Sequence, residues 1–345
     1  MRESKENILF VTIDGGGNLP PVLGLAEEFH ERGYQVSVLS EPCLEGLITS
    51  LGYQFIPFQK YFTRKDRKED IFKDSNVSPM KNPVLDNIVF GPAINETRSR
   101  LNLPRLEQTS DLVHGADLRL IQTLERFDFP LEPKPENVRY TGPFLNDPDW
   151  ISPWSDPWPG KDSRPLVVIS LSSTFQNQYA AIQSAMDALR GQEIRGLVTL
   201  GPVLRKESFT VPENVVVVES APHSEVFPEA DLVITHAGHG TVMKALSHGL
   251  PLVCLPMGRD QNDNAIKIQH HGCGMALSAK AGPEKIRKAV LHILSEGAFR
   301  KAAAGFQKEI RANDQKHLMW REIEDLMDPN NEREIRLEEA DVRYA

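Results

Sequence analysis

A glycine-rich segment in the second half of the chain has the residue types of an anion-binding site. The apolar run Leu232–Thr235 predicts a buried strand, and a turn and a short helix that ends at Gly249 follow it. The turn holds His236, Gly238, His239, Gly240 and Thr241. Unbonded backbone N–H groups and the positive end of the helix dipole lie at the start of such a helix, where they attract an anion. The segment therefore predicts a phosphate site.

An acid and an amide follow the next predicted strand, Leu252–Leu255. Asp260 and Gln261 come a few residues after the carboxyl end of that strand. Because open α/β sheets bind ligands beyond the carboxyl ends of their strands, we expect this pair to share a crevice with the phosphate site. Carboxylate and amide groups hydrogen-bond sugar hydroxyls, so the combination predicts a nucleotide-sugar pocket. Asp260 also suits the N-cap of the helix that follows, and the two roles are compatible.

Composition and charge narrow the class of protein. The 345 residues suit two domains, and the 40% hydrophobic and 25% charged content is that of a soluble globular protein. A net charge of −9 without a basic block argues against nucleic acid as the main partner. The three cysteines show neither metal spacing nor a disulfide framework, and Cys254 lies in an apolar strand, where it suits the core. No apolar run is long enough to span a bilayer and no signal peptide is evident, so we expect a cytoplasmic protein.

The pattern of apolar residues in the first half predicts an N-terminal α/β domain over residues 1–150. A βαβαβ series is expected, with strands at 8–13, 35–40 and 54–58 and helices at 20–32 and 42–51. The charged segment 59–82 breaks this pattern and is interpreted as a surface loop. A helix is predicted at 92–113, with strands at 118–124 and 137–141.

A second βα series is predicted over residues 165–327, after a linker at 151–164. The linker region is rich in proline, and we expect the tryptophans around it, Trp150, Trp154 and Trp158, to anchor it. The expected strands are 166–171, 195–200, 215–218, 231–235, 251–255 and 274–277. The expected helices are 176–190, 239–248, 261–271, 283–296, 298–312 and 314–327. The charged segment 328–345 is expected to be a tail.

Several stretches together resemble a known family. They are ILFVTIDGGGNLPPVLGLAEEFHERGYQVSVLS, FGPAINETRSRLNLP and VRYTGPFL in the first half, and PLVVISLSSTFQ, APHSEVFPEADLVITHAGHGT and GRDQNDNA in the second. With these motifs the chain resembles glycosyltransferase family 1, which includes bacterial macrolide, antibiotic and terpenoid glycosyltransferases and plant secondary-metabolite glycosyltransferases. The resemblance implies the α/β GT-B fold, two doubly wound Rossmann-like domains facing across a cleft.

The resemblance also implies a reaction and a donor site. The reaction is an inverting, metal-independent transfer of a glycosyl group from a nucleoside diphosphate sugar (a UDP- or TDP-sugar) to a hydroxyl of a natural product or lipid-like acceptor. No cofactor is implied beyond this co-substrate. His236, Gly240 and Thr241 match residues that hold the donor diphosphate, while Asp260 and Gln261 match residues that hydrogen-bond the donor sugar. The remaining donor-site positions are Ser173, Thr174, His223 and Gly238.

The acceptor side departs from the family pattern. Asn18 stands where many relatives carry a catalytic histidine, and an amide cannot act as a general base. Asn18 also suits the cap of the following helix. Asp14 is the only acid of this loop, beside Gly15, Gly16 and Gly17, and would need to lie within ~3 Å of the acceptor hydroxyl to act as the base.

Three further departures keep an alternative open. Lys244 replaces a glutamate that holds the nucleotide ribose, and Ser220 replaces the tryptophan that plant relatives stack on the base. The charged segment 59–82 replaces structure that builds much of the acceptor pocket in relatives. The alternative is a catalytically impaired, nucleotide-sugar-binding GT-B homologue. The donor nucleotide, the sugar, the acceptor and the oligomeric state are not predicted.

Overall fold

The structure, a computed structural model, describes residues 7–13, 19–58, 65–66, 95–96, 98–99, 104–108, 110–129, 132–145, 154–158, 162–172, 176–201, 204–312 and 315–328. The chain divides into two compact units, one of residues 1–78 with 144–312 and the other of residues 79–143 with 313–345. The predicted domain limits at residues 150, 165 and 327 stay a prediction.

The N-terminal part of the first unit contains the predicted βαβαβ series. Its elements are β1 (Asn7–Val11), α1 (Leu19–Glu31), β2 (Gln35–Ser40), α2 (Glu45–Ser50) and β3 (Gln54–Pro57). The strands form a parallel sheet in the order β1-β2-β3. Helix α1 buries Leu23, Ala26 and Phe29, which recur at helical spacing, and the chain leaves the helix through Gly33, whose φ is +86°. A short 3₁₀ turn at Pro42–Leu44 replaces the start of the predicted second helix.

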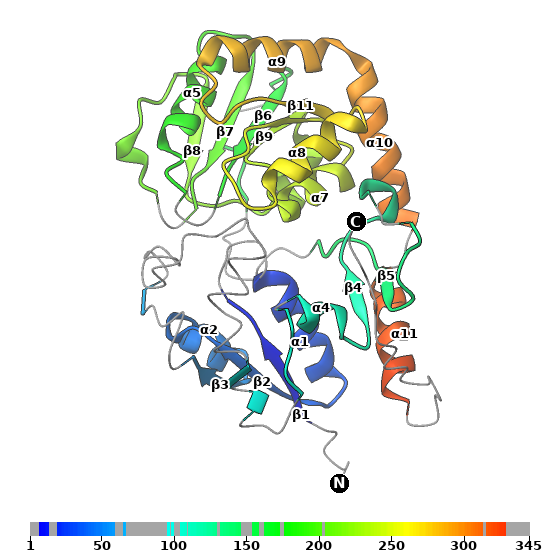
Figure 1. Ribbon diagram of the computed structural model, residues 1–345. Helices are drawn as coiled ribbons and strands as arrows, with labels where there is room; N and C mark the ends of the chain where they lie inside the picture. Colours follow the sequence, from blue (N-terminus) through cyan, green and yellow to red (C-terminus); the bar gives the residue numbers. More distant parts are fainter. Residues whose placement is uncertain are drawn as a thin grey trace. The chain divides into compact units, whose positions relative to one another are not determined.

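A six-stranded parallel sheet forms the rest of the first unit (Figure 1). Its strands are β6 (Leu166–Ser170), β7 (Arg195–Thr199), β8 (Val215–Val218), β9 (Leu232–Thr235), β10 (Leu252–Cys254) and β11 (Gly274–Ala276). Its helices are α5 (Tyr179–Leu189), α6 (His223–Val226), α7 (His239–Ser247), α8 (Gln261–His270), α9 (Pro283–Ser295) and α10 (Gly297–Ala312). Every residue of the central strands β6 and β9 is buried, which explains their continuous apolar runs. All six predicted strands are confirmed.

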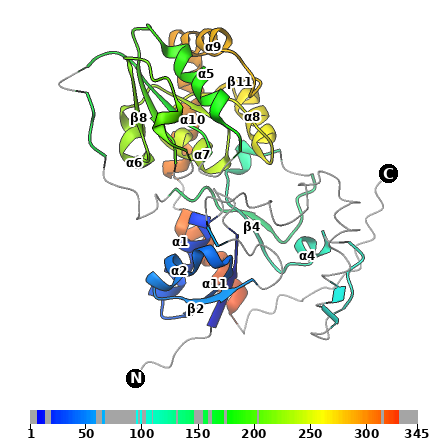
Figure 2. The ribbon, with the colours of Figure 1, turned by 90° about the vertical axis from the view of Figure 1, so that its left-hand side faces the viewer.

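The helices cover both faces of this sheet. Val167 and Ile169 of β6 point into a core that α5 and α9 complete, and α5 lies beside α9 in Figures 1 and 2. Val168, which alternates with them, points to the opposite face, where α7 packs against α10. Cys254 is fully buried, and burial raises the pKa of its thiol to about 12. The prediction of a core cysteine is confirmed.

The strand order creates a switch point between β6 and β9. The sheet runs β11-β10-β9-β6-β7-β8, so the chain moves outward from β6 to β8 and then returns to the other side of β6 as β9. The loops that follow β6 and β9 therefore leave the same edge of the sheet in opposite directions. Such a point at the carboxyl edge is where doubly wound sheets bind ligands.

The second unit contains β4 (Arg119–Ile121), β5 (Val138–Tyr140), α4 (Asp111–His114) and α11 (Gln315–Met327). The strands β4 and β5 are parallel, and Arg139 Nε lies 3.1 Å from Glu322 Oε2 of α11. The predicted continuous helix 92–113 is wrong at residues 104–108, whereas its last residues belong to α4. Residues 95, 96, 98 and 99 are helical, but 104–108 are not, because Pro104 cannot continue a helix and restricts the residue before it.

None of the helices in the described part of the chain combines the length and apolar character that a membrane span requires. Only residues 65–66 of the predicted loop 59–82 lie among the described residues. Of the predicted tail, only Asp328 does. The cytoplasmic location stays a prediction.

Candidate functional site

The candidate site is built by the loops that follow β9 and β10 at the carboxyl edge of the six-stranded sheet. β9 and β10 are paired, with Thr235 opposite Cys254, and Leu255 N donates to Thr235 O at 2.8 Å. The segments that follow β9 and β10 therefore leave the sheet at the same level. They enter α7 and α8, which lie side by side in Figure 1. This register brings the predicted phosphate turn next to the predicted sugar-binding pair.

The turn before α7 presents backbone N–H groups. Ala237 has a φ of +67°, and its N–H donates to Thr235 Oγ1 at 3.3 Å. Gly238 is the N-cap of α7 and supplies no side-chain cap, and Val242 N is the donor to Gly238 O at 3.0 Å. The N–H groups of the first turn precede this hydrogen bond and have no carbonyl within the helix. A Cβ added at Gly240 would meet no atom within 4 Å, so the space beside this turn is open.

His236 is a buried, neutral histidine beside this turn. Its side chain is 9% exposed, and its Nδ1 lies 3.5 Å from Thr235 Oγ1. Burial lowers its pKa to about 4; the charge of Asp260 acts in the opposite direction, and that of Arg259 lowers it further. Thr235 Oγ1 accepts from Ala237 N–H and has a second lone pair, so this contact fits either tautomer; where the Thr235 hydroxyl donates to Nδ1, the ring proton lies on Nε2. Nε2–H is then a hydrogen-bond donor at neutral pH.

Gly238 makes room for this imidazole. A Cβ built on Gly238 would lie 2.6 Å from His236 Nε2 and 2.8 Å from Cε1. Any larger residue at position 238 would therefore displace the ring from its place beside the α7 N-terminus. The structure brings together His236, Gly238, Gly240 and Thr241, as the motif predicts.

Asp260 is next to this group, through a contact that the sequence analysis missed. It occupies the N-cap position of α8 but makes no side-chain cap hydrogen bond, so the capping interpretation is wrong for its carboxylate. Instead, Asp260 Oδ2 accepts from Asn264 Nδ2 at 2.9 Å, and the same Nδ2 donates to Ala237 O at 3.0 Å. The spacing of Asp260 and Asn264, four residues apart on a predicted helix, was the available signal.

Gln261 has internal partners rather than an open face. Its side chain is 1% exposed; Oε1 accepts from Met257 N at 2.8 Å, and Nε2 donates to Gln176 Oε1 at 2.9 Å. Gln176 in turn donates to Ser172 Oγ at 3.1 Å. This chain of amides ties the loop after β10 to the loop after β6. The predicted sugar contact of Gln261 stays a prediction, and Gln176 is a more exposed amide at the same place.

His223 lies farther along the same edge. It begins α6, after β8, and its Nε2 lies 3.2 Å from Ser170 Oγ at the end of β6. Ser170 Oγ also accepts from Thr199 Oγ1 at 3.0 Å, and the ring of His223 stacks on Phe227 at 4.3 Å. His223 is thus on the β7–β8 side of the switch point, whereas Asp260 is on the β10 side.

Several predicted site residues lie outside the described residues. They are Asp14, Gly15, Gly16, Gly17, Asn18, Ser173 and Thr174. Lys244 lies on α7 and is half-buried, and its effect on nucleotide binding stays a prediction. Within the described ranges, no group of three or more His, Cys, Asp or Glu residues is arranged to hold a metal ion.

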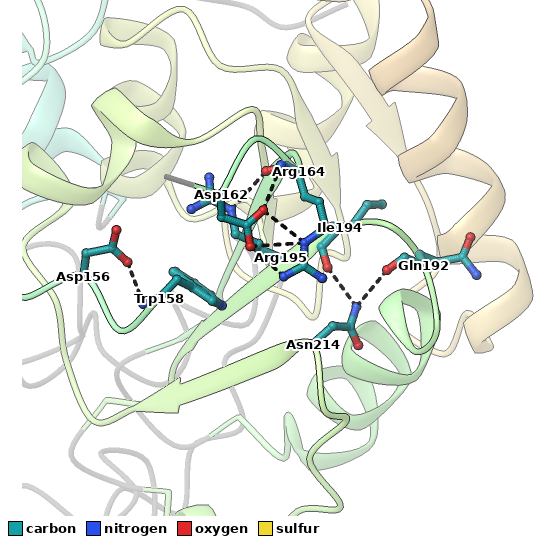
Figure 3. Close-up of polar contacts among 8 residues, drawn as sticks. All are labelled: Asp156, Trp158, Asp162, Arg164, Gln192, Ile194, Arg195 and Asn214. Atoms are coloured by element: carbon teal, nitrogen blue, oxygen red, sulfur yellow. Dashed lines mark hydrogen bonds and ion pairs between the residues drawn. The ribbon is translucent and has the colours of Figure 1, made fainter. Parts of the chain in front are cut away.

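The opposite, amino edge of the sheet carries a second polar cluster, which joins the segment before β6 to the start of β7 (Figure 3). Arg164 Nη2 lies 2.6 Å from Asp162 Oδ2, and Arg195 at the start of β7 donates from Nε to Arg164 O at 3.0 Å. The Arg195 guanidinium lies 5.2 Å from the ring centroid of Trp158. Trp158 therefore contacts the start of β7, and its predicted role as a linker anchor stays a prediction.

Comparison with known sequences points to one family. Residues 185–326 match the family described as erythromycin biosynthesis protein CIII-like, C-terminal domain. The 4'-demethylrebeccamycin synthase of Lentzea aerocolonigenes is 32% identical over 224 residues, which are 63% of this chain and 52% of that protein. The chain thus spans about half the length of the curated relatives it matches.

Solved structures agree on the fold. CalG4, the calicheamicin glycosyltransferase, is similar with a TM-score of 0.70 and 19% identity, over 94% of this chain and 98% of that chain. The glycosyltransferase VinC, solved in complex with DTDP, has a TM-score of 0.63 and 16% identity, over 93% of this chain and 99% of that one. At such low identity these likenesses concern the fold, and the predicted GT-B class is confirmed.

Proposed function

We propose that this chain, a homologue of the family 1 glycosyltransferases with the GT-B fold, transfers a glycosyl group from a nucleoside diphosphate sugar to a hydroxyl group of a small molecule. The donor is a UDP- or TDP-sugar, and the acceptor is a natural product or a lipid-like molecule. No cofactor beyond this donor takes part.

One observation carries the proposal. At the switch point of the sheet, the neutral imidazole of His236 and the N-terminus of α7 lie beside the carboxylate of Asp260, to which Asn264 connects them. Two kinds of donor suit a diphosphate, and an exposed carboxylate suits sugar hydroxyls. A phosphate-binding group beside a hydroxyl-binding group is the chemistry that a nucleotide sugar requires.

The proposed reaction is a single displacement with inversion. The acceptor oxygen attacks the anomeric carbon as the bond from that carbon to the diphosphate oxygen breaks. The acceptor proton passes to a base, for which Asp14 is the candidate, since the amide of Asn18 cannot accept it. The departing diphosphate gains negative charge, and the N–H groups of α7 and Nε2–H of His236 stabilise that charge without a metal.

The order of groups along the sheet edge gives the donor a direction. Asp260 follows β10, His236 follows β9, and Ser170 and His223 lie toward β7 and β8. With the diphosphate at the α7 N-terminus, the sugar extends toward Asp260 and the nucleoside toward His223. Ser173 and Thr174, which follow Ser172 in the sequence, stay proposed contacts of the diphosphate.

A transfer assay with purified protein tests the proposal. UDP- and TDP-sugars are supplied with a panel of hydroxyl-bearing natural products, and product and free diphosphate are measured by chromatography. The His236→Ala variant is expected to lose about 10²- to 10³-fold in turnover, as for the removal of one donor to a leaving or developing anion. His114→Ala, an exposed histidine of the other unit, is the matched control and should keep the parent activity.

Two outcomes contradict the proposal in different ways. Equal turnover in the parent and His236→Ala would remove His236 from the site. Calorimetric binding of a nucleotide sugar without turnover over the whole acceptor panel would assign the alternative, a nucleotide-sugar-binding homologue that has lost catalysis.

A further inference from the structure

We propose that Asn264 is a positioning residue that holds the sugar-binding carboxylate of Asp260 at a set distance from the diphosphate turn. This inference rests on the proposed function, because it assigns the two groups that Asn264 connects to two parts of one donor. Asn264 itself touches neither part. It acts through Asp260 and through the backbone of Ala237.

The geometry uses both hydrogens of one amide nitrogen. Nδ2 of Asn264 lies 3.0 Å from Ala237 O and 2.9 Å from Asp260 Oδ2. An amide –NH₂ group carries two protons, so each acceptor receives one. Asn264 is 4% exposed, and its own N–H donates to Asp260 O at 3.1 Å, which fixes it one helical turn after Asp260. The amide is therefore a rigid bridge rather than a surface contact.

At one end of the bridge is a backbone conformation that needs support. Ala237 has a φ of +67°, which a residue with a Cβ adopts rarely, and its side chain is fully buried. A buried carbonyl without a donor is unfavourable, so the bond from Asn264 stabilises the left-handed turn. That turn directs the chain from His236 into α7. Asn264 therefore supports the diphosphate-binding geometry.

At the other end is a carboxylate that would otherwise rotate. Asp260 is exposed, and in the described part of the chain Asn264 is the residue whose side chain hydrogen-bonds its carboxylate. The bond engages Oδ2 and leaves Oδ1 for a sugar hydroxyl. Holding one oxygen removes rotational freedom before the ligand arrives, and such preorganisation raises affinity for the group that is bound.

The test compares two ligands in the same protein. Calorimetry measures the affinity for a nucleoside diphosphate and for the matching nucleoside diphosphate sugar. The ratio of the affinity for the nucleotide sugar to the affinity for the diphosphate isolates the contribution of the sugar. In Asn264→Ala we expect this ratio to fall about tenfold, as for the loss of a hydrogen bond to a charged group. The affinity for the diphosphate alone should fall as well, because the Ala237 turn loses its donor. A purely structural role would leave the ratio of the two affinities unchanged.

A double-variant cycle decides whether Asn264 acts through Asp260. Asp260→Ala removes the side chain that Asn264 positions, so adding Asn264→Ala to it should change the ratio no further. Additive losses in Asp260→Ala/Asn264→Ala would overturn the proposal, as would a parent-like ratio in Asn264→Ala. Asn262→Ala, an exposed residue of the same helix, is the control and should behave as the parent.

Folding is followed by thermal unfolding of every variant. Asn264→Asp nearly conserves the shape, and its ionised carboxylate cannot donate to either acceptor, so it should show the same loss of ratio if Asn264→Ala does not fold. Loss of the folded state in both variants would make Asn264 a folding residue and overturn the proposal. Failure of the proposed donor site looks different, because the parent protein itself would then bind neither UDP- nor TDP-sugars, and binding without turnover would leave this comparison of affinities intact.

Discussion

The two edges of the six-stranded sheet use polar residues in opposite ways. At the amino edge (Figure 3), Asp162, Arg164 and Arg195 share ion pairs and hydrogen bonds, and Trp158 covers Arg195. At the carboxyl edge, His236 is buried beside the neutral hydroxyl of Thr235, and the space beside Gly240 is open. The same sheet thus ends in a saturated cluster on one side and in unsatisfied donors on the other.

The protonation of the two clusters shows the same contrast. The side-chain hydrogen bond from Arg164 lowers the pKa of Asp162 to about 2, so its charge is favoured. At the other edge, burial lowers the pKa of His236 to about 4, so its charge is disfavoured. The side chains at the amino edge are bonded to one another, whereas the carboxyl edge presents N–H groups that have no acceptor within α7. The comparison predicts that changes at one edge alter stability and changes at the other alter binding.

The largest expected effect is on the pH dependence of the free energy of unfolding, to which the two edges contribute in different pH ranges. His236 titrates near 6.5 when unfolded and near 4 when folded. Between these values the unfolded chain binds the proton and the folded chain does not, so stability present above pH 6.5 is lost as pH falls toward 4. The loss amounts to about 3 kcal/mol for this one group. Urea unfolding between pH 7.5 and 4 measures it, and His236→Gln should reduce the fall.

Asp162 should act in a lower window. Its folded pKa is about 2 against 3.8 for the ordinary group, so its contribution is present above 3.8 and is lost as pH falls toward 2. Asp162 is half-buried and lies at the surface, so solvent screens part of this contribution. The His236 prediction is contradicted if the free energy of unfolding of His236→Gln depends on pH between 7 and 4 in the same way as that of the parent. His236 is then not the group that makes the two edges respond differently to pH.

Removal of the buried guanidinium at the amino edge is expected to have an intermediate effect. Arg195 is 9% exposed, and Arg195→Ala would remove both its hydrogen bond to Arg164 O and its stacking on Trp158. We expect a loss of about 2 kcal/mol in the free energy of unfolding, from these contacts together. Donor affinity, measured by calorimetry, should stay at the parent value. A fall in affinity that exceeds the fall in stability would show that the edges are coupled.

The smallest effect on stability is expected at Gly240. A Cβ has open space there, and alanine favours a helix by up to about 1 kcal/mol over glycine, so Gly240→Ala should fold at least as well as the parent. Its methyl group occupies the space beside the first N–H groups of α7, so diphosphate affinity should fall about tenfold. Gly297→Ala, in the first turn of α10 and also without neighbours within 4 Å, is the control for affinity. Tighter binding in Gly240→Ala would place the diphosphate elsewhere.

The fold of the second half was predictable because its signals are local. The continuous apolar runs of β6 and β9 indicate strands buried on both faces, and Gly249, with a φ of +68°, follows α7 as its sequence position suggests. The helix predicted at 92–113 is wrong at residues 104–108, because Pro104 cannot continue a helix even where both flanking segments are helical. The motif from His236 to Thr241 was likewise predictable, since strand, glycine turn and helix N-terminus are adjacent in the chain.

The amino-acid sequence by itself determined the order of strands and helices in the six-stranded sheet, the glycine-rich turn before α7 and the position of Asp260 beyond β10. Only the tertiary structure decided that Gln261 bonds to Gln176, that Asn264 joins Asp260 to Ala237, and that Arg195 lies against Trp158. The backbone conformation of a residue is limited by its neighbours in the chain, so the spacing of apolar residues indicates whether a segment is a helix or a strand. The partner of a polar side chain depends on which segments the packed sheet brings within about 3 Å, and no local pattern encodes that distance.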